Sequence, residues 1–232
     1  MAVQSSARTA LMQRETLATK DRVPVNVPSL VRGSLDLFRD SYFMGLTFIG
    51  GFGMASFFVF LASASFVYTD HYGLTPTQFS LAFAANAIGF FTASQFAAGL
   101  GERFGMKRVM LRASMGFAAC AVALLVIALV APVSLFVLMG MLFLANACLG
   151  LVIPTAMVMA LDDHGDRAGL ASSLGGTLQM VAGALMIALT GPFFDGTPLP
   201  MIAAIALCAV IALVLAVLVL GRPVATQPSI AE

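Results

Sequence analysis

The sequence predicts an all-α membrane protein, a bundle of six transmembrane helices. Three observations predict this class: the composition, the spacing of the charged residues, and the side on which the basic residues fall. Of the 232 residues, 60% are hydrophobic and 10% are charged, whereas a soluble domain carries about 25% charged residues. So few charges cannot cover a soluble surface, and a net charge of +1 gives no basic excess for binding nucleic acid. The composition therefore excludes a soluble enzyme and a nucleic-acid-binding protein.

Long stretches without Asp, Glu, Lys or Arg mark the spans. The charge-free stretches are residues 41–69, 71–101, 113–161, 168–194 and 196–221. One span needs about 20 apolar residues, so the third stretch is too long for a single span, and Pro132 near its middle indicates a turn. Six spans are therefore expected, with no room for twelve. They are expected at 43–67, 77–100, 109–131, 133–160, 168–193 and 199–220.

Local signals support these limits. Thr75-Pro76-Thr77-Gln78 is a capping box with proline in the first helical turn, Thr197-Pro198 repeats the Thr-Pro start, and Asp166 can cap the fifth span. The six-helix domain is expected over residues 43–221.

Both flanking segments are expected to be tails. Residues 1–42 contain no apolar segment typical of a signal peptide, and residues 222–232 follow the last span. Residues 29–40 are either a short amphipathic helix at the membrane interface or a solvated linker.

The basic residues predict the orientation. With six spans, all 12 Lys and Arg residues lie in the tails, in the second and fourth connections, or next to them. The opposite connections, residues 68–76, 131–133 and 194–198, contain none. Because basic residues accumulate on the cytoplasmic side of membrane proteins, we expect both termini in the cytoplasm.

Polar side chains inside the spans are candidates for a substrate cavity. An amide in hydrocarbon is costly unless it has a partner or faces water. Four amides lie in the second, fourth and fifth spans: Asn86, Gln95, Asn146 and Gln179. They either face one polar cavity or bond to neighbouring helices. No charged residue lies near the midpoint of any span, so this sequence itself offers no evident group for proton coupling.

Small residues predict close contacts between helices. In the second span they recur every four residues, at Ala85, Gly89, Ala93, Ala97 and Gly101, and form one smooth stripe. The three cysteines, Cys120, Cys148 and Cys208, all fall inside spans and are expected to be small packing residues. We therefore expect no catalytic residue, no metal site and no cofactor.

The connection between the second and third spans carries a motif. The segment Ala98-Gly-Leu-Gly-Glu-Arg-Phe-Gly-Met-Lys-Arg108 resembles the G-x-x-x-D-R-x-G-[RK]-[RK] signature of the major facilitator superfamily. Ala98 replaces the first Gly, Glu102 replaces the Asp, and the basic pair falls one position late. The alternative interpretation is a hydrophilic turn that obeys the positive-inside rule.

In this family the loop acts as a cytoplasmic latch. The resemblance implies that Glu102 accepts hydrogen bonds from the amino-terminal end of the fifth span, where the helix dipole favours an anion. It also implies that Arg103 and Arg108 pair with acidic residues after the fourth span. The latch candidates are Glu102, Arg103, Gly105, Lys107, Arg108, Asp162, Asp163 and Asp166.

Further strings resemble the carboxy-terminal half of Bcr/CflA-type drug-resistance transporters. They are residues 72–79, 153–156, 167–174 with Gln179 and Gly183, and 195–200. The tail from Glu15 to Asp40 resembles the central loop that joins the two halves of these transporters. The resemblance covers residues 14–221 and implies one half of a major-facilitator fold, with two inverted three-helix repeats, in the cell inner (plasma) membrane.

The function implied is multidrug efflux by proton-coupled antiport and alternating access, with lipophilic small molecules as substrates. The resemblance also implies that six helices and the proton-coupling carboxylate lie outside this sequence. In the lipid bilayer, the expected partner is a missing amino-terminal six-helix half or a second copy of the chain. The alternatives are an inactive or assembly-partner fragment of a split or truncated transporter, and a major-facilitator exporter of another small metabolite.

Overall fold

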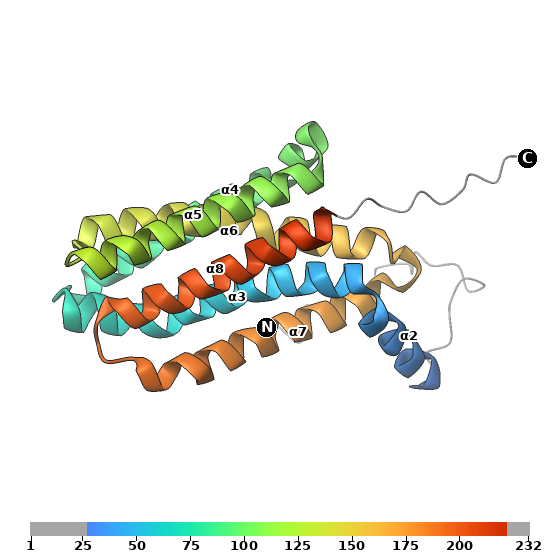
Figure 1. Ribbon diagram of the computed structural model, residues 1–232, viewed down its shortest axis with the longest axis horizontal. Coiled ribbons are helices and arrows are strands. Elements are labelled where there is room, and N and C mark those ends of the chain that lie inside the picture. Colours follow the sequence, from blue (N-terminus) through green and yellow to red (C-terminus); the bar gives the residue numbers. More distant parts are fainter. Residues whose placement is uncertain (1–26, 222–232) are drawn as a thin grey trace, which may run out of the picture.

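The computed structural model describes residues 27–221, without the side chains of Val27, Ser29 and Asp166, and this part of the chain is helical (Figure 1). The predicted tail segments 1–26 and 222–232 lie outside the described residues. A short helix, α2 (Val27–Arg39), precedes the bundle, and a short helical turn, η3 (Gly165–Arg167), lies within it. The long helices are α3 (Ser41–Phe66) continued by the π-helix η2 (Val67–His71), α4 (Pro76–Phe104), α5 (Met106–Val130), α6 (Leu135–Asp162), α7 (Ala168–Thr190) continued by η4 (Gly191–Phe193), and α8 (Pro198–Leu220).

Six of these segments are long and apolar enough to cross a membrane. They coincide with the six predicted spans to within a few residues, so the predicted all-α six-span bundle is confirmed. The capping box before α4 is also confirmed: the Gln78 backbone N–H donates to the Thr75 hydroxyl (3.3 Å), and the Thr75 N–H donates to Gln78 Oε1 (3.0 Å).

Two predicted helix ends differ from the structure. The connection expected at 101–108 is the single residue Gly105, whose φ of +87° lets the chain reverse while α4 and α5 continue up to it. The N-cap position of α7 is held by Arg167, because Asp166 falls inside η3.

The helices form two inverted three-helix repeats. α3 packs against α6, α7 and α8, α6 packs against α3, α4 and α5, and α5 packs against α8 (Figure 1). If α3, α4 and α5 are exchanged with α6, α7 and α8, the same list of contacts results: α3–α7 becomes α6–α4, α3–α8 becomes α6–α5, and α3–α6 and α5–α8 become themselves. Because corresponding helices are three positions apart in the order of spans, an odd number, the two repeats cross the membrane in opposite directions.

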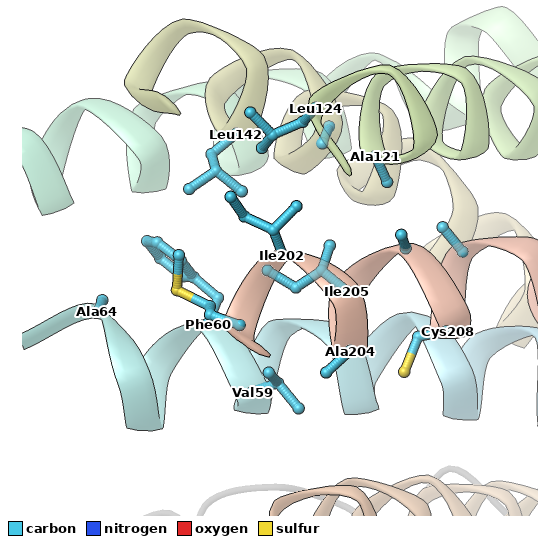
Figure 2. Close-up of a cluster of buried hydrophobic side chains, with 14 of the residues drawn as sticks. Val59, Phe60, Ala64, Ala121, Leu124, Leu142, Ile202, Ala204, Ile205 and Cys208 are labelled. Atoms are coloured by element: carbon cyan, nitrogen blue, oxygen red, sulfur yellow. The ribbon is translucent and has the colours of Figure 1, made fainter. Parts of the chain in front are cut away.

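The core consists of two clusters of buried apolar side chains. Figure 2 shows one of them, in which Phe60 of α3, Leu124 of α5, Leu142 of α6 and Ile202 of α8 gather around α8. The second cluster lies nearer the start of α3 and includes Leu37, so α2 contributes to the core. Cys208 is fully buried and free, as expected of a packing residue.

The smooth stripe of α4 faces α6. A Cβ placed on Gly89 would lie 2.7 Å from the ring of Phe143, and one placed on Gly150 of α6 would meet the backbone carbonyl of Phe90. The Cβ built on Gly150 would lie 3.1 Å from the Phe90 carbonyl carbon and 3.3 Å from the Cβ of Ala93. The two helices therefore approach at backbone contact here, which the absence of a side chain at Gly150 permits.

Hydrogen bonds fix side chains in the three connections at the far end of α3. The Tyr72 hydroxyl donates to the carbonyl of Val133 (2.7 Å), which joins the first connection to the third. Asp195 accepts hydrogen bonds from the Thr197 hydroxyl (2.6 Å) and the Thr197 backbone N–H (2.9 Å), and these bonds lower the pKa of Asp195. The turn before α8 is thus closed by Asp195.

We predict that Gly150→Ala destabilises the bundle by about 1–3 kcal/mol, because a methyl group at this contact must push α4 and α6 apart. The control is Gly140→Ala in the same helix, where an added Cβ meets nothing within 4 Å and alanine improves helix propensity by about 0.5–1 kcal/mol. The measurement is the apparent Tm of the detergent-purified chain, followed by the reaction of a fluorogenic maleimide with its cysteines, of which Cys208 is buried in the folded chain. Equal Tm values for the two variants would contradict the close approach.

Candidate functional site

Two of the four candidate amides bond to each other across a helix contact. Asn86 of α4 and Asn146 of α6 are both buried, and Asn146 Nδ2 donates to Asn86 Oδ1 (3.2 Å). Asn86 Nδ2 donates in turn to the carbonyl of Ala82 (3.1 Å). Such a bond between helices in a membrane contributes about 0.6 kcal/mol on average, so the pair supports the α4–α6 contact.

Gln179 occupies the corresponding contact in the other repeat, between α7 and α3. Its side chain is buried, and a Cβ placed on Gly50 would lie 2.7 Å from Gln179 Nε2. Gly51 lies against the same residue, with 3.8 Å from a built Cβ to the Cα of Gln179. The two glycines leave the space that the amide fills.

Gln95 differs from the other three because its side chain is exposed on the outer side of α4. The structure therefore brings together Asn86 and Asn146, but it places Gln179 in the separate contact between α3 and α7 and Gln95 on the exposed side of α4. A cavity lined by all four would require surfaces outside this bundle. Their contact with a substrate stays a prediction.

A cavity of about 980 Å³ opens at the end of the bundle where α3 begins. Its walls come from the start of α3, the α4–α5 turn and the ends of α6 and α8. It contains five latch candidates, Gly105, Lys107, Arg108, Asp162 and Asp163, together with Asp40 and Tyr42. Carboxylates and basic groups thus line one cavity, while Met106, Met159 and Val219 supply apolar walls.

The remaining latch candidates lie around this end. Glu102 and Arg103 are exposed in the last turn of α4, and the guanidinium of Arg103 lies 5.3 Å from the centre of the Phe104 ring. Among the described side chains, no ion pair within 4.0 Å joins Arg103 or Arg108 to Asp162 or Asp163, and none of the hydrogen bonds links Glu102 to α7. The side chain of Asp166 lies outside the description. The latch role of these residues stays a prediction.

The side chains that contact one another at this end are not among the latch candidates. Asp40 is the N-cap of α3: its Oδ1 accepts from the N–H groups of Tyr42 (2.8 Å) and Phe43 (3.2 Å). Its Oδ2 lies 3.1 Å from Nε2 of His164, whose Nδ1 lies 3.2 Å from the carbonyl of Ala160. One carboxylate therefore starts a span and contacts the α6–α7 connection.

A second pair links α2 to the same connection. Arg167 Nη1 donates to Asp36 Oδ2 (3.0 Å), and both side chains are more than half exposed, so the pair is worth under about 1 kcal/mol. Asp36 and Asp40 are four residues apart, and His164 and Arg167 are three apart. Arg167 and Asp36 lie 131 residues apart in the chain, and spacing within one helix predicts only pairs three or four residues apart, so the sequence carried no signal for this contact.

Comparisons with known proteins agree with this architecture. The family model of the Major Facilitator Superfamily matches residues 42–232. The chain is 31% identical over 205 residues to an uncharacterized MFS-type transporter, YdgK, of Bacillus subtilis (strain 168), an alignment that covers 87% of this chain and 50% of that protein. It is 26% identical over 201 residues to a bicyclomycin resistance protein homolog of Haemophilus influenzae, covering 85% of this chain and 49% of that protein.

The chain therefore spans about half the length of the curated relatives it matches. No solved structure matches it. The family match covers most of the residues and coincides with the six spans, and the chain belongs to the major facilitator superfamily of membrane transporters.

Proposed function

We propose that the chain is the carboxy-terminal half of a multidrug efflux transporter of Bcr/CflA type, which exports lipophilic small molecules in exchange for protons by alternating access. The observation that carries this proposal is the extent of the match: one complete pair of inverted repeats aligns with half of each relative. A relative named for bicyclomycin resistance supports the drug substrates. We also propose cytoplasmic termini in the plasma membrane, from the distribution of the 12 basic residues.

The energy-coupling group is proposed to lie in the other half. In the described spans the charged residues lie within two turns of a helix end, at Asp70, Glu102, Arg103, Lys107, Arg108, Arg112 and Asp162. A proton-coupled transporter needs a group inside the membrane that gains and loses a proton. The chain therefore needs a partner bundle for coupling.

We predict that the chain alone does not move drug, and that the chain co-expressed with the six preceding helices of its transporter does. The preceding helices would be taken from the reading frame upstream of Met1. The measurement is uptake of ethidium into inside-out vesicles driven by a pH gradient, with a protonophore as the control that collapses the gradient.

Three kinds of result would contradict this proposal. Gradient-driven uptake by the chain alone would indicate a homodimer instead. Absence of uptake by the paired halves, or absence of an upstream frame that encodes six helices, would favour the inactive membrane fragment. Uptake of a different metabolite but not of drugs would favour the third alternative, an exporter of another small metabolite.

The latch proposal predicts that Glu102→Ala slows export by the reassembled transporter about two- to fivefold, because an anion at a helix amino terminus contributes about 0.3–1 kcal/mol. Glu102→Asp restores the residue of the family signature and should keep the wild-type rate. Asp70→Ala, a change of an exposed carboxylate at the opposite end, controls for loss of charge alone. Unchanged export and Tm in Glu102→Ala would exclude the latch role.

The cavity proposal predicts that Gln179→Met changes which drugs are exported and leaves expression unchanged. Methionine keeps the length of the side chain beside Gly50 but removes the amide that would bond to a substrate. Export of a panel of lipophilic cations and neutral drugs, each relative to wild type, gives the profile. A profile identical to wild type for every compound would identify Gln179 as a packing residue.

A further inference from the structure

α2 carries an apolar surface that the bundle does not cover. One side of the helix is docked, because Leu37 is buried in the second core cluster and Gly33 lies against Leu170 of α7. Successive residues of an α-helix are rotated by about 100° around its axis, and on this basis four other apolar side chains lie within an arc of roughly 140° next to the docked side. They are between 39% and 54% exposed: Leu30, Val31, Leu35 and Phe38.

Basic residues border this apolar arc. Arg32 and Arg39 are exposed and follow the arc on the side away from Gly33 and Leu37. Asp36 lies beyond them and bonds to Arg167. A helix with an apolar face edged by arginine is typical of a helix that lies in a membrane surface, because the apolar side chains enter the lipid while the guanidinium groups reach the headgroups.

The junction with α3 sets the depth of α2. Only Asp40 separates Arg39 from Ser41, the first residue of a span. The carboxylate of Asp40 caps α3 and contacts His164, so the junction is held from two sides. α2 therefore lies at the level where the first span enters the bilayer.

We infer that α2 is a membrane-surface anchor. Its apolar arc enters the headgroup and upper acyl region of the leaflet at this end of the bundle, and Arg32 and Arg39 contact anionic lipid headgroups. A lipid surface fits this arc better than a protein partner, because a protein covering it would also desolvate two arginines that have no carboxylate partner among the described side chains. Through Asp36 and Asp40 the anchor also holds the α6–α7 connection.

The sequence contains no tryptophan, so a single indole reports on this surface without background. The full chain carrying Phe38→Trp would be placed in vesicles of phosphatidylcholine and phosphatidylglycerol. We expect a several-fold lower acrylamide quenching constant than for Arg32→Trp, a matched variant on the polar side of the same helix. Lipids with a nitroxide near the headgroup should quench the indole at position 38 more than lipids with a deep nitroxide.

A second tryptophan variant and a change of lipid composition complete the experiment. Leu35→Trp tests the same arc if Phe38→Trp does not fold. Omitting phosphatidylglycerol should raise acrylamide quenching several-fold, and the double change Arg32→Gln and Arg39→Gln should remove that dependence on anionic lipid.

Equal acrylamide quenching at positions 38 and 32, without quenching by lipid nitroxides, would overturn the anchor. In another outcome, the indole at position 38 is protected from acrylamide only when the preceding six helices are added, again without quenching by lipid nitroxides. That result would show that protein covers the arc, and it would also overturn the anchor. Drug uptake is measured separately, so failure of the anchor leaves the transport proposal unaffected.

Discussion

The hydrocarbon core of the bilayer is the constraint on which the rest of this structure depends. A charged side chain at the centre of a span costs about 2.5–3.5 kcal/mol or more, and an unpaired backbone group costs several. The chain meets both demands with long helices whose charges lie at their ends. The ends thereby become the polar parts of the molecule. One end holds the 980 Å³ cavity and the Asp36–Arg167 and Asp40–His164 contacts, and the other holds the Tyr72–Val133 bond and the Asp195 turn.

A second consequence concerns how the helices hold together. Lipid tails are as apolar as leucine, so close packing and hydrogen bonds rather than hydrophobic exclusion join helices in a membrane. Close approaches occur at α4–α6 and at α3–α7, the two contacts that correspond to each other in the repeats: a Cβ built on Gly150 would meet Phe90, and one built on Gly50 would meet Gln179. The buried amides lie at these same contacts, with Asn86 and Asn146 at α4–α6. Each repeat thus places an amide where glycine lets a neighbour come close.

Features that depend on one helix alone could be predicted from the sequence. Hydropathy located all six spans because every residue of a span meets lipid or a packed neighbour, and the capping box placed the start of α4. Features that depend on which helices are neighbours could not be predicted. Asp40 meets His164, and Asn86 meets Asn146, only after the bundle has formed. The connection at 101–108 was predicted too long, because polar residues continue the helices on both sides of Gly105.

The least covered helices bear on the proposed partner bundle. α4 and α7, the second helix of each repeat, have the smallest buried shares of all six spans, 22% and 28% against 61% for the first span. The exposed hydroxyls of Ser173 and Thr177 on α7 bond to carbonyls of their own helix and so tolerate lipid. The exposed amide of Gln95 has no such bond among the described residues. An amide left facing hydrocarbon is costly, and water or a second bundle on this side of α4 removes that cost. The uncovered sides of α4 and α7 therefore favour an assembly in which this six-helix unit packs against another.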